Sequence, residues 1–124
     1  MPTESIRTIT GVAGEAISVY RFVDPQSDQT WDMGDAATDL CGGISAEAVA
    51  SGENFPIAVF DGSIGHIELG ATIAAGVMVS CGTNGVAAAA STTTNQLVYG
   101  PLLVGGDSGE IVEIQMYMRT IAPA

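Results

Sequence analysis

Apolar and polar positions alternate over many short stretches of this chain, and glycines or other turn-forming residues separate the stretches. Alternation with a period of two is typical of strands that bury one face. The pattern therefore predicts an all-β fold, a compact barrel or sandwich of about eight to ten short strands with almost no helix. The predicted strands cover residues 15–23, 55–60, 63–69, 77–80, 86–90, 97–104 and 110–119.

Several segments between these strands have a distinct turn or loop chemistry. Asp61-Gly62 and Asn84-Gly85 predict tight turns, because both positions tolerate a positive φ. The acidic stretch 24–39 predicts a long loop or irregular hairpin with at most one helical turn. The alanine-rich stretch 44–50 is long enough for two helical turns, but its flanking glycines favour a strand. Residues 91–96 predict an uncharged polar loop.

The second part of the chain repeats features of the first part at a distance of 57 positions. Gly43 falls on Gly100, and the triplet 51–53 (Ser-Gly-Glu) falls on the identical triplet 108–110. The apolar positions of 55–60 fall on those of 112–117, and 17–23 falls on 74–80. This register predicts an internal duplication with units 13–60 and 70–117. The alternative is a chance match, which any glycine-rich β chain can offer.

The 124 residues are enough for one domain with a modest core. We expect a single β domain over 13–120 and a short tail over 121–124. Residues 1–12 carry little apolar surface, and we expect either a frayed end or an arm that orders against a partner. Small apolar residues dominate the core, and a chain of this kind often gains stability by association.

The charge balance narrows the possible partners. Fourteen acidic residues face three basic ones, all arginine, for a net charge of −11. This charge repels phosphate backbones and anionic lipid surfaces, so we expect neither nucleic acid nor membrane as a partner. The N-terminus lacks a secretory signal pattern, which predicts folding in a cytoplasm. In that reducing compartment Cys41 and Cys81 are expected as two small buried thiols, with a disulfide as the alternative.

Candidate catalytic and metal-binding patterns are weak throughout. His66 is the single histidine, and we expect it on a strand surface or an interface, since no nucleophile motif accompanies it. The acids of 24–39 lack the ligand spacing of a calcium loop. The glycines of 105–109 are followed by neither lysine nor helix, as a phosphate loop would require. The sequence predicts a non-enzymatic protein without cofactor or metal.

Trp31 and Met33 stand out because they interrupt an acidic, polar stretch. An exposed tryptophan often anchors an interface. With Ile6 and Ile9 of the expected arm, these residues form our predicted contact surface. The alternative is that Trp31 folds back and covers one end of the barrel.

The turns of residues 60–118 follow one another in a familiar order: Asp61-Gly62, Gly70 with Gly76, the run 84–87 (Asn-Gly-Val-Ala), and the run 100–104 before 109–112 (Gly-Glu-Ile-Val). This succession resembles the capsid decoration (cement) proteins of tailed bacteriophages. The resemblance implies a small β protein, usually trimeric, that binds the outside of an assembled capsid and carries no catalytic residues. The acidic loop around Trp31 departs from that pattern.

From the resemblance we expect a virion structural protein on the capsid exterior, assembled in the host cytoplasm. Its partners would be the major capsid protein and further copies of itself, as a homotrimer that stabilises capsomer junctions. The alternative is a glycan- or receptor-binding β module of a phage head fibre, with Trp31 as a stacking platform. An enzyme that uses His66 as a base is the third hypothesis.

Overall fold

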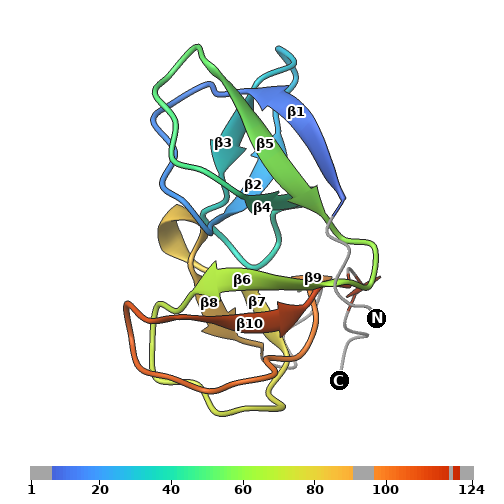
Figure 1. The fold of residues 1–124 in the computed structure, drawn as a ribbon, viewed down its shortest axis with the longest axis vertical. Coiled ribbons are helices and arrows are strands. Elements are labelled where there is room, and N and C mark those ends of the chain that lie inside the picture. Colours follow the sequence, from blue (N-terminus) through green and yellow to red (C-terminus); the bar gives the residue numbers. More distant parts are fainter. Residues whose placement is uncertain (1–6, 91–96, 118, 121–124) are drawn as a thin grey trace.

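The computed structural model describes residues 7–90, 97–117 and 119–120, and it confirms the all-β prediction. Among these residues no helix reaches the length and hydropathy that crossing a bilayer needs. One short 3₁₀ turn, η1 (Thr83–Gly85), accompanies the strands (Figure 1). The strands of the described residues are β1 (Thr8–Val12), β2 (Phe22–Pro25), β3 (Trp31–Met33), β4 (Gly43–Ser45), β5 (Asn54–Val59), β6 (Ile64–Glu68), β7 (Val79–Cys81), β8 (Ala87–Ala89), β9 (Leu97–Val98), β10 (Ile111–Gln115) and β11 (Arg119–Thr120).

The N-terminal half, β1 to β5, is one antiparallel sheet in the order β1-β5-β4-β2-β3. A parallel bridge between Ala13 and Trp31 joins the two ends of this order, so the sheet closes on itself. A small core lies inside the closed sheet, because side chains alternate along each strand and the apolar ones point to the same face of the sheet. Its buried members are Ala13, Ile17, Val23, Phe55 and Ile57.

The C-terminal half, β6 to β11, is built from the pairs β6–β10, β7–β8 and β9–β11. Single bridges join these pairs, namely Leu69–Ala87, Met78–Pro101 and Leu102–Ile114. In Figure 1 this half lies below the first along the long axis, with β6 and β10 in front of β7 and β8. The larger core of the protein belongs mostly to this half and reaches across to Phe22 and Ile44.

The two halves repeat one pattern of backbone hydrogen bonds. The matched residues of 13–20, between β1 and β2, correspond to residues 56 positions later. Those of 45–53, from the end of β4 to the start of β5, correspond to residues 57 positions later, so the C-terminal half has one extra residue between the two segments. The duplication itself stays a prediction, which these bonds support. The matched bonds are Ala13–Glu53 with Leu69–Glu110, Gly52–Ala13 with Gly109–Leu69, Ile17–Val49 with Ile73–Gly106, and Tyr20–Ser45 with Gly76–Leu102.

Several expectations from the sequence are wrong. The predicted strand over 97–104 reduces to β9, since Gly100 takes a φ of 123°. Residues Thr8–Val12 of the expected arm form β1 and pair along their whole length with β5 of the same chain, because their β-branched side chains suit an edge of this sheet. The predicted strand 15–23 reduces to β2 at its end, since Tyr20 takes a positive φ and breaks the alternation. The predicted strand over 44–50 reduces to β4.

Both predicted tight turns are confirmed. Gly62 has a φ of 89°, and Asn84 and Gly85 have φ values of 57° and 76°. Gly85 also has to be a glycine for space, because a Cβ there would lie 2.5 Å from the carbonyl oxygen of Phe22. The turn at Asn84-Gly85 therefore brings the C-terminal half close against β2.

Aromatic rings fill the junction between the halves. The rings of Phe22 and Tyr99 lie 4.8 Å apart, and those of Phe60 and Tyr99 are stacked at 5.0 Å. The Tyr99 hydroxyl donates a hydrogen bond to the Asp39 carbonyl at 2.6 Å and accepts one from the Cys41 N–H at 3.0 Å. Buried rings with satisfied polar groups hold the halves as one body.

Candidate interaction surface

The four predicted contact residues do not form one patch. Ile6 lies outside the described residues. Ile9 is on β1 and is 45% exposed. Trp31 and Met33 are half-buried on β3 and cover the N-terminal core. Their role in an interface stays a prediction.

The Trp31 ring folds back onto the sheet. It lies against the backbone of Gly11 and Gly42, where a Cβ would come within 2.7 and 2.9 Å of the ring. The two glycines thus provide the space for the indole. The alternative hypothesis from the sequence, in which Trp31 folds back and covers one end of the barrel, describes the position of this ring better than full exposure does.

The acidic stretch forms a polar groove of about 250 Å³ beside β2 and β3. Burial, together with the charges of Asp39 and Asp32, raises the pKa of Asp24 to about 6. Nowhere in the described chain do three or more His, Cys, Asp or Glu side chains converge as a metal ion would need. The groove is lined by Glu15, Asp24, Gln26, Asp32, Met33, Asp35 and Asp39.

Several carboxylates of the acidic stretch 24–39 stabilise its turns by accepting hydrogen bonds. Asp28 accepts hydrogen bonds from the backbone and hydroxyl of Thr30, which lower the pKa of Asp28. Asp39 accepts from the N–H groups of Asp35 and Ala36 at 2.8 and 3.1 Å. They act as side-chain caps for the irregular backbone of the loop.

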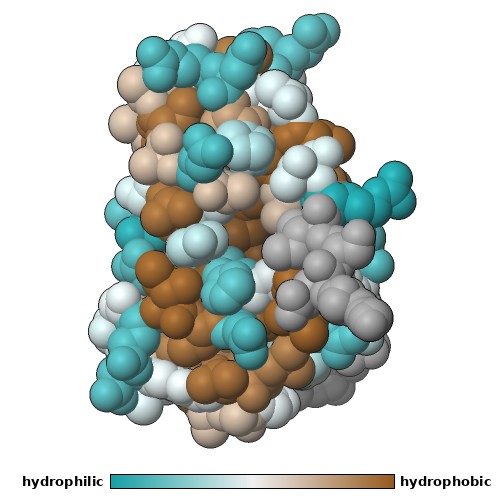
Figure 2. Space-filling view, in the orientation of Figure 1, coloured by the Kyte–Doolittle hydropathy of each residue, from teal (hydrophilic) through white to brown (hydrophobic). Residues whose placement is uncertain are grey.

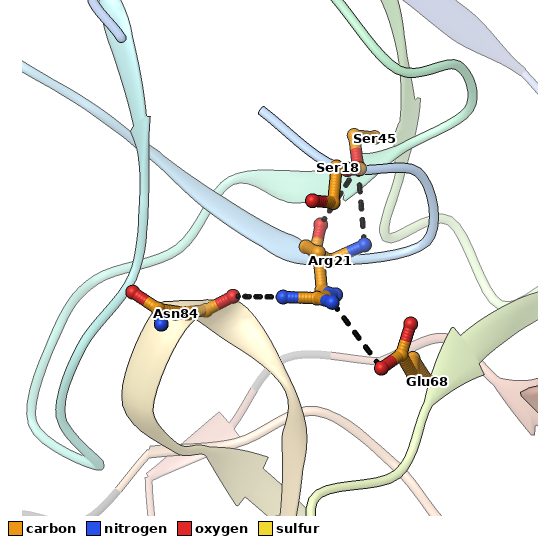
Figure 3. A network of polar contacts seen from close by, with 5 residues as sticks. All are labelled: Ser18, Arg21, Ser45, Glu68 and Asn84. Carbon is orange, nitrogen blue, oxygen red and sulfur yellow. Dashed lines mark hydrogen bonds and ion pairs between the residues drawn. The ribbon is translucent and has the colours of Figure 1, made fainter. Parts of the chain in front are cut away.

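Arg21 joins the two halves by a polar network (Figure 3). Its guanidinium donates to the Glu68 carboxylate at 3.2 Å and to the Asn84 carbonyl at 3.0 Å. Its own N–H donates to the Ser45 hydroxyl, which donates in turn to the Ser18 carbonyl at 2.6 Å. Arg21 thereby ties the segment before β2 to β4, β6 and η1.

Beside this network lies a pocket of about 290 Å³ between the halves, which we call the junction pocket. Its lining is largely apolar. The Tyr20 and His66 rings face each other across the halves at 5.6 Å with 45° between their planes. The lining residues are Tyr20, Ile44, Ser45, Ala46 and Ala58 from the N-terminal half, and Gly65 and His66 from β6.

Tyr20 is held in an unusual backbone conformation, with a φ of 60°. A bulky residue is rarely found there, because its Cβ crowds the backbone. The matching position of the C-terminal half is Gly76, with a φ of 84°. The N–H groups of Tyr20 and Gly76 make the same bond, each 2.8 Å long, to Ser45 and Leu102 respectively. The turn itself therefore does not need a tyrosine.

Cys41 and Cys81 are both buried and form no disulfide, as the sequence predicts. The two sulfurs are neighbours, since a Cβ on Gly34 would lie 2.8 Å from the Cys41 Sγ and 2.5 Å from the Cys81 Sγ. The hydrogen bond with Cys41 and burial both raise the pKa of Cys81. A thiol with a raised pKa is a poor nucleophile at neutral pH.

No protein-family model matches the sequence, and neither does any curated protein sequence. Among solved structures, the fold matches the head fiber gp8.5 N base in bacteriophage phi29, with a TM-score of 0.72 and 16% sequence identity. The match covers 90% of this chain and 94% of the phage chain. The two proteins share a fold. At this identity the likeness extends to the fold alone.

Tyr20, the residue that most distinguishes the junction pocket, was not predicted from the sequence as a site residue. A signal was present in the repeat, because a tyrosine stands where the second copy has a glycine. The register of 57 concealed it by placing Tyr20 on Val77. A register of 56 for this segment became visible only through the matched hydrogen bonds.

Proposed function

We propose that this chain is a structural protein of a phage virion and forms the base module of a fibre that stands on the head. The observation that carries the proposal is the shared fold with the phi29 head fibre base, which extends over nearly the whole of both chains. In this role the chain is not an enzyme. It binds, and it lies on the capsid exterior.

The construction of the molecule supports a holding role. In each half, single β-bridges join strands that would otherwise be at the edges, so only short strand edges of the described residues stay unpaired. Short, covered edges protect a β protein from unwanted strand pairing. Rings and the Arg21 network join the halves, so that a load on one half is carried into the other.

Apolar side chains on the surface support association with the capsid and with further copies. Figure 2 shows hydrophobic residues on this face of both halves, including several in the lower half with hydrophilic residues between them. Ile111 at the start of β10 is 46% exposed, and Leu103, bonded to the Glu113 carbonyl, is 40% exposed. We propose this surface for contacts within a homotrimer.

A decoration protein without a fibre is the second candidate. The succession of turns over residues 60–118, which resembles capsid decoration proteins, favours it. Both candidates place the chain on the outside of the head, against the major capsid protein.

Electron cryo-microscopy of the virions whose genome encodes this chain tests the proposal. We expect the chain in purified particles by mass spectrometry, and its density at the foot of a projecting fibre. Density over capsomer junctions without a fibre would favour the decoration protein. Absence of the chain from intact particles would overturn both candidates.

A further inference from the structure

We propose that the junction pocket receives an apolar side chain from a basic segment of the partner protein. The proposal rests on the proposed function and deepens it, because it names the attachment surface and the chemistry of what attaches. The pocket is an anchor site, in which one deeply seated residue supplies much of the binding free energy.

The size and lining of the pocket fit a side chain. Its volume of about 290 Å³ is at the lower end of small-molecule sites, which span roughly 300–1,000 Å³. Ile44, Ala46 and Ala58 provide an apolar floor, and the Tyr20 and His66 rings form a wall. An aliphatic or aromatic residue finds apolar contact there.

The backbone of Tyr20 gives an independent reason to assign a role to this wall. Disfavoured φ values on bulky residues cluster at functional sites, since the surrounding fold has to impose them. The matching turn of the C-terminal half is made by Gly76 without this strain. The N-terminal half therefore carries a strained tyrosine where the fold itself accepts glycine.

The rim of the pocket gives the charge of the partner. Glu47 is exposed and directly follows Ala46, while Glu113 stands opposite His66 in the β6–β10 register. Of the arginines with described side chains, Arg21 is engaged by Glu68 and Asn84, and Arg7 lies close enough to Asp61 to lower the pKa of that carboxyl. The rim thus presents negative charge, which complements lysine or arginine beside the anchor.

Charge also decides against a second copy of this chain as the occupant. Each copy carries a net charge of −11, so a second copy seated at this acidic rim would be repelled, whereas the homotrimer contacts proposed above use the apolar side chains of Ile111 and Leu103. A basic partner meets no such repulsion. The occupant is therefore a segment of a different protein.

Nuclear magnetic resonance titration of the full chain with short capped peptides tests the proposal without any virion. The probes are Lys-Leu-Lys, Lys-Gly-Lys and Glu-Leu-Glu. We expect Lys-Leu-Lys to shift the amide signals of Tyr20, Ala46, Ala58 and His66, with a dissociation constant on the order of 1 mM. The other two peptides lack either the anchor or the charge and should bind at least about tenfold more weakly.

Variants separate the pocket from the fold. Tyr20→Gly removes the wall and relieves the strain, so it should fold at an unchanged or higher melting temperature and lose about tenfold in affinity. Gln29→Gly is the matched control, because Gln29 also has a positive φ, of 71°, but lies in the exposed β2–β3 turn. It should bind as the parent does. His66→Ala changes an exposed side chain and should weaken binding without loss of fold.

Two outcomes would overturn the inference. One is equal binding of all three peptides, and the other is a set of shifts confined to the acidic groove. Failure here with the chain present on virions would refute the pocket and leave the proposed function intact. If the chain is absent from virions but the peptides bind as expected, the proposed function is refuted and the pocket stands.

Discussion

The guanidinium of Arg21 and the carboxylate of Glu68 meet 3.2 Å apart across the boundary between the halves, with side chains 16% and 25% exposed. They come from positions 47 residues apart in the chain. A half-buried, charge-assisted bond of this kind stabilises through geometry, because both partners are already held by neighbouring strands. Tyr20 directly precedes Arg21 in the chain, so the Arg21–Glu68 pair also supports the pocket wall that the Tyr20 ring forms.

Arg21→Met tests this joint while keeping most of the aliphatic stem. We expect a loss of about 2 kcal/mol in the free energy of unfolding, because the bonds to Glu68 and to the Asn84 carbonyl both disappear. Urea unfolding followed by circular dichroism measures it. Glu68→Gln is the milder partner variant, since its amide oxygen still accepts a bond, and it should lose less than about 1 kcal/mol. Equal losses in the two variants would contradict this account.

Gly100→Ala should be among the most destabilising small substitutions in the chain. Gly100 has a φ of 123°, and an added Cβ would overlap the carbonyl oxygen of Gln115, which is backbone and cannot move aside. We expect a loss of at least about 3 kcal/mol in unfolding free energy. Gly52→Ala is the control, because Gly52 has a φ of 86° but open space around it, and should lose about 1 kcal/mol. A thermal denaturation series ranks the two.

Asp24 should make the protein less stable as the pH rises from about 4 to above 6. Burial, with the charges of Asp39 and Asp32, raises the pKa of Asp24 from 3.8 to about 6 in the folded protein. The folded state then binds the proton more tightly than the unfolded chain does. The contribution is complete below the unfolded pKa and is lost as the pH passes the folded pKa.

Asp24→Asn removes this dependence, so the variant should melt higher than the parent at pH 7.5, with a smaller difference at pH 4. Asp28→Asn is the opposite case. Hydrogen bonds from Thr30 lower the pKa of Asp28, so its contribution is present above pH 3.8 and is lost as the pH falls through the lower folded pKa. An Asp24→Asn variant that melts below the parent at pH 7.5 would refute the assignment.

Cys41 and Cys81 should be inert toward a thiol reagent in the folded protein. Both are buried, and the pKa of Cys81 is raised by its hydrogen bond with Cys41 and by burial. We expect almost no colour with Ellman's reagent at pH 8, and two thiols per chain after denaturation in guanidinium under nitrogen. Fast reaction of the native protein would show that the pair is accessible.

The local features of this fold could be predicted from the sequence. Alternation and turn chemistry indicated an all-β protein, because pleated strands and positive-φ turns each depend on a few neighbouring residues. The turns at Asp61-Gly62 and Asn84-Gly85 were placed correctly for that reason. The net charge of −11, from which we expect no nucleic-acid partner, is likewise a property of composition.

Only the tertiary structure decided what those local elements contact. β1 was mistaken for an arm because its partner β5 lies more than forty residues further along the chain. The junction pocket joins Tyr20 to His66, and Tyr20 with its φ of 60° donates a backbone hydrogen bond to Ser45, 25 positions further along the chain. Such contacts depend on how distant strands pair and close, and a linear pattern does not encode that closure in any one stretch. The sequence alone thus determined the all-β class and the tight turns, whereas the pairing of distant segments decided the extent of the strands and created the candidate surface.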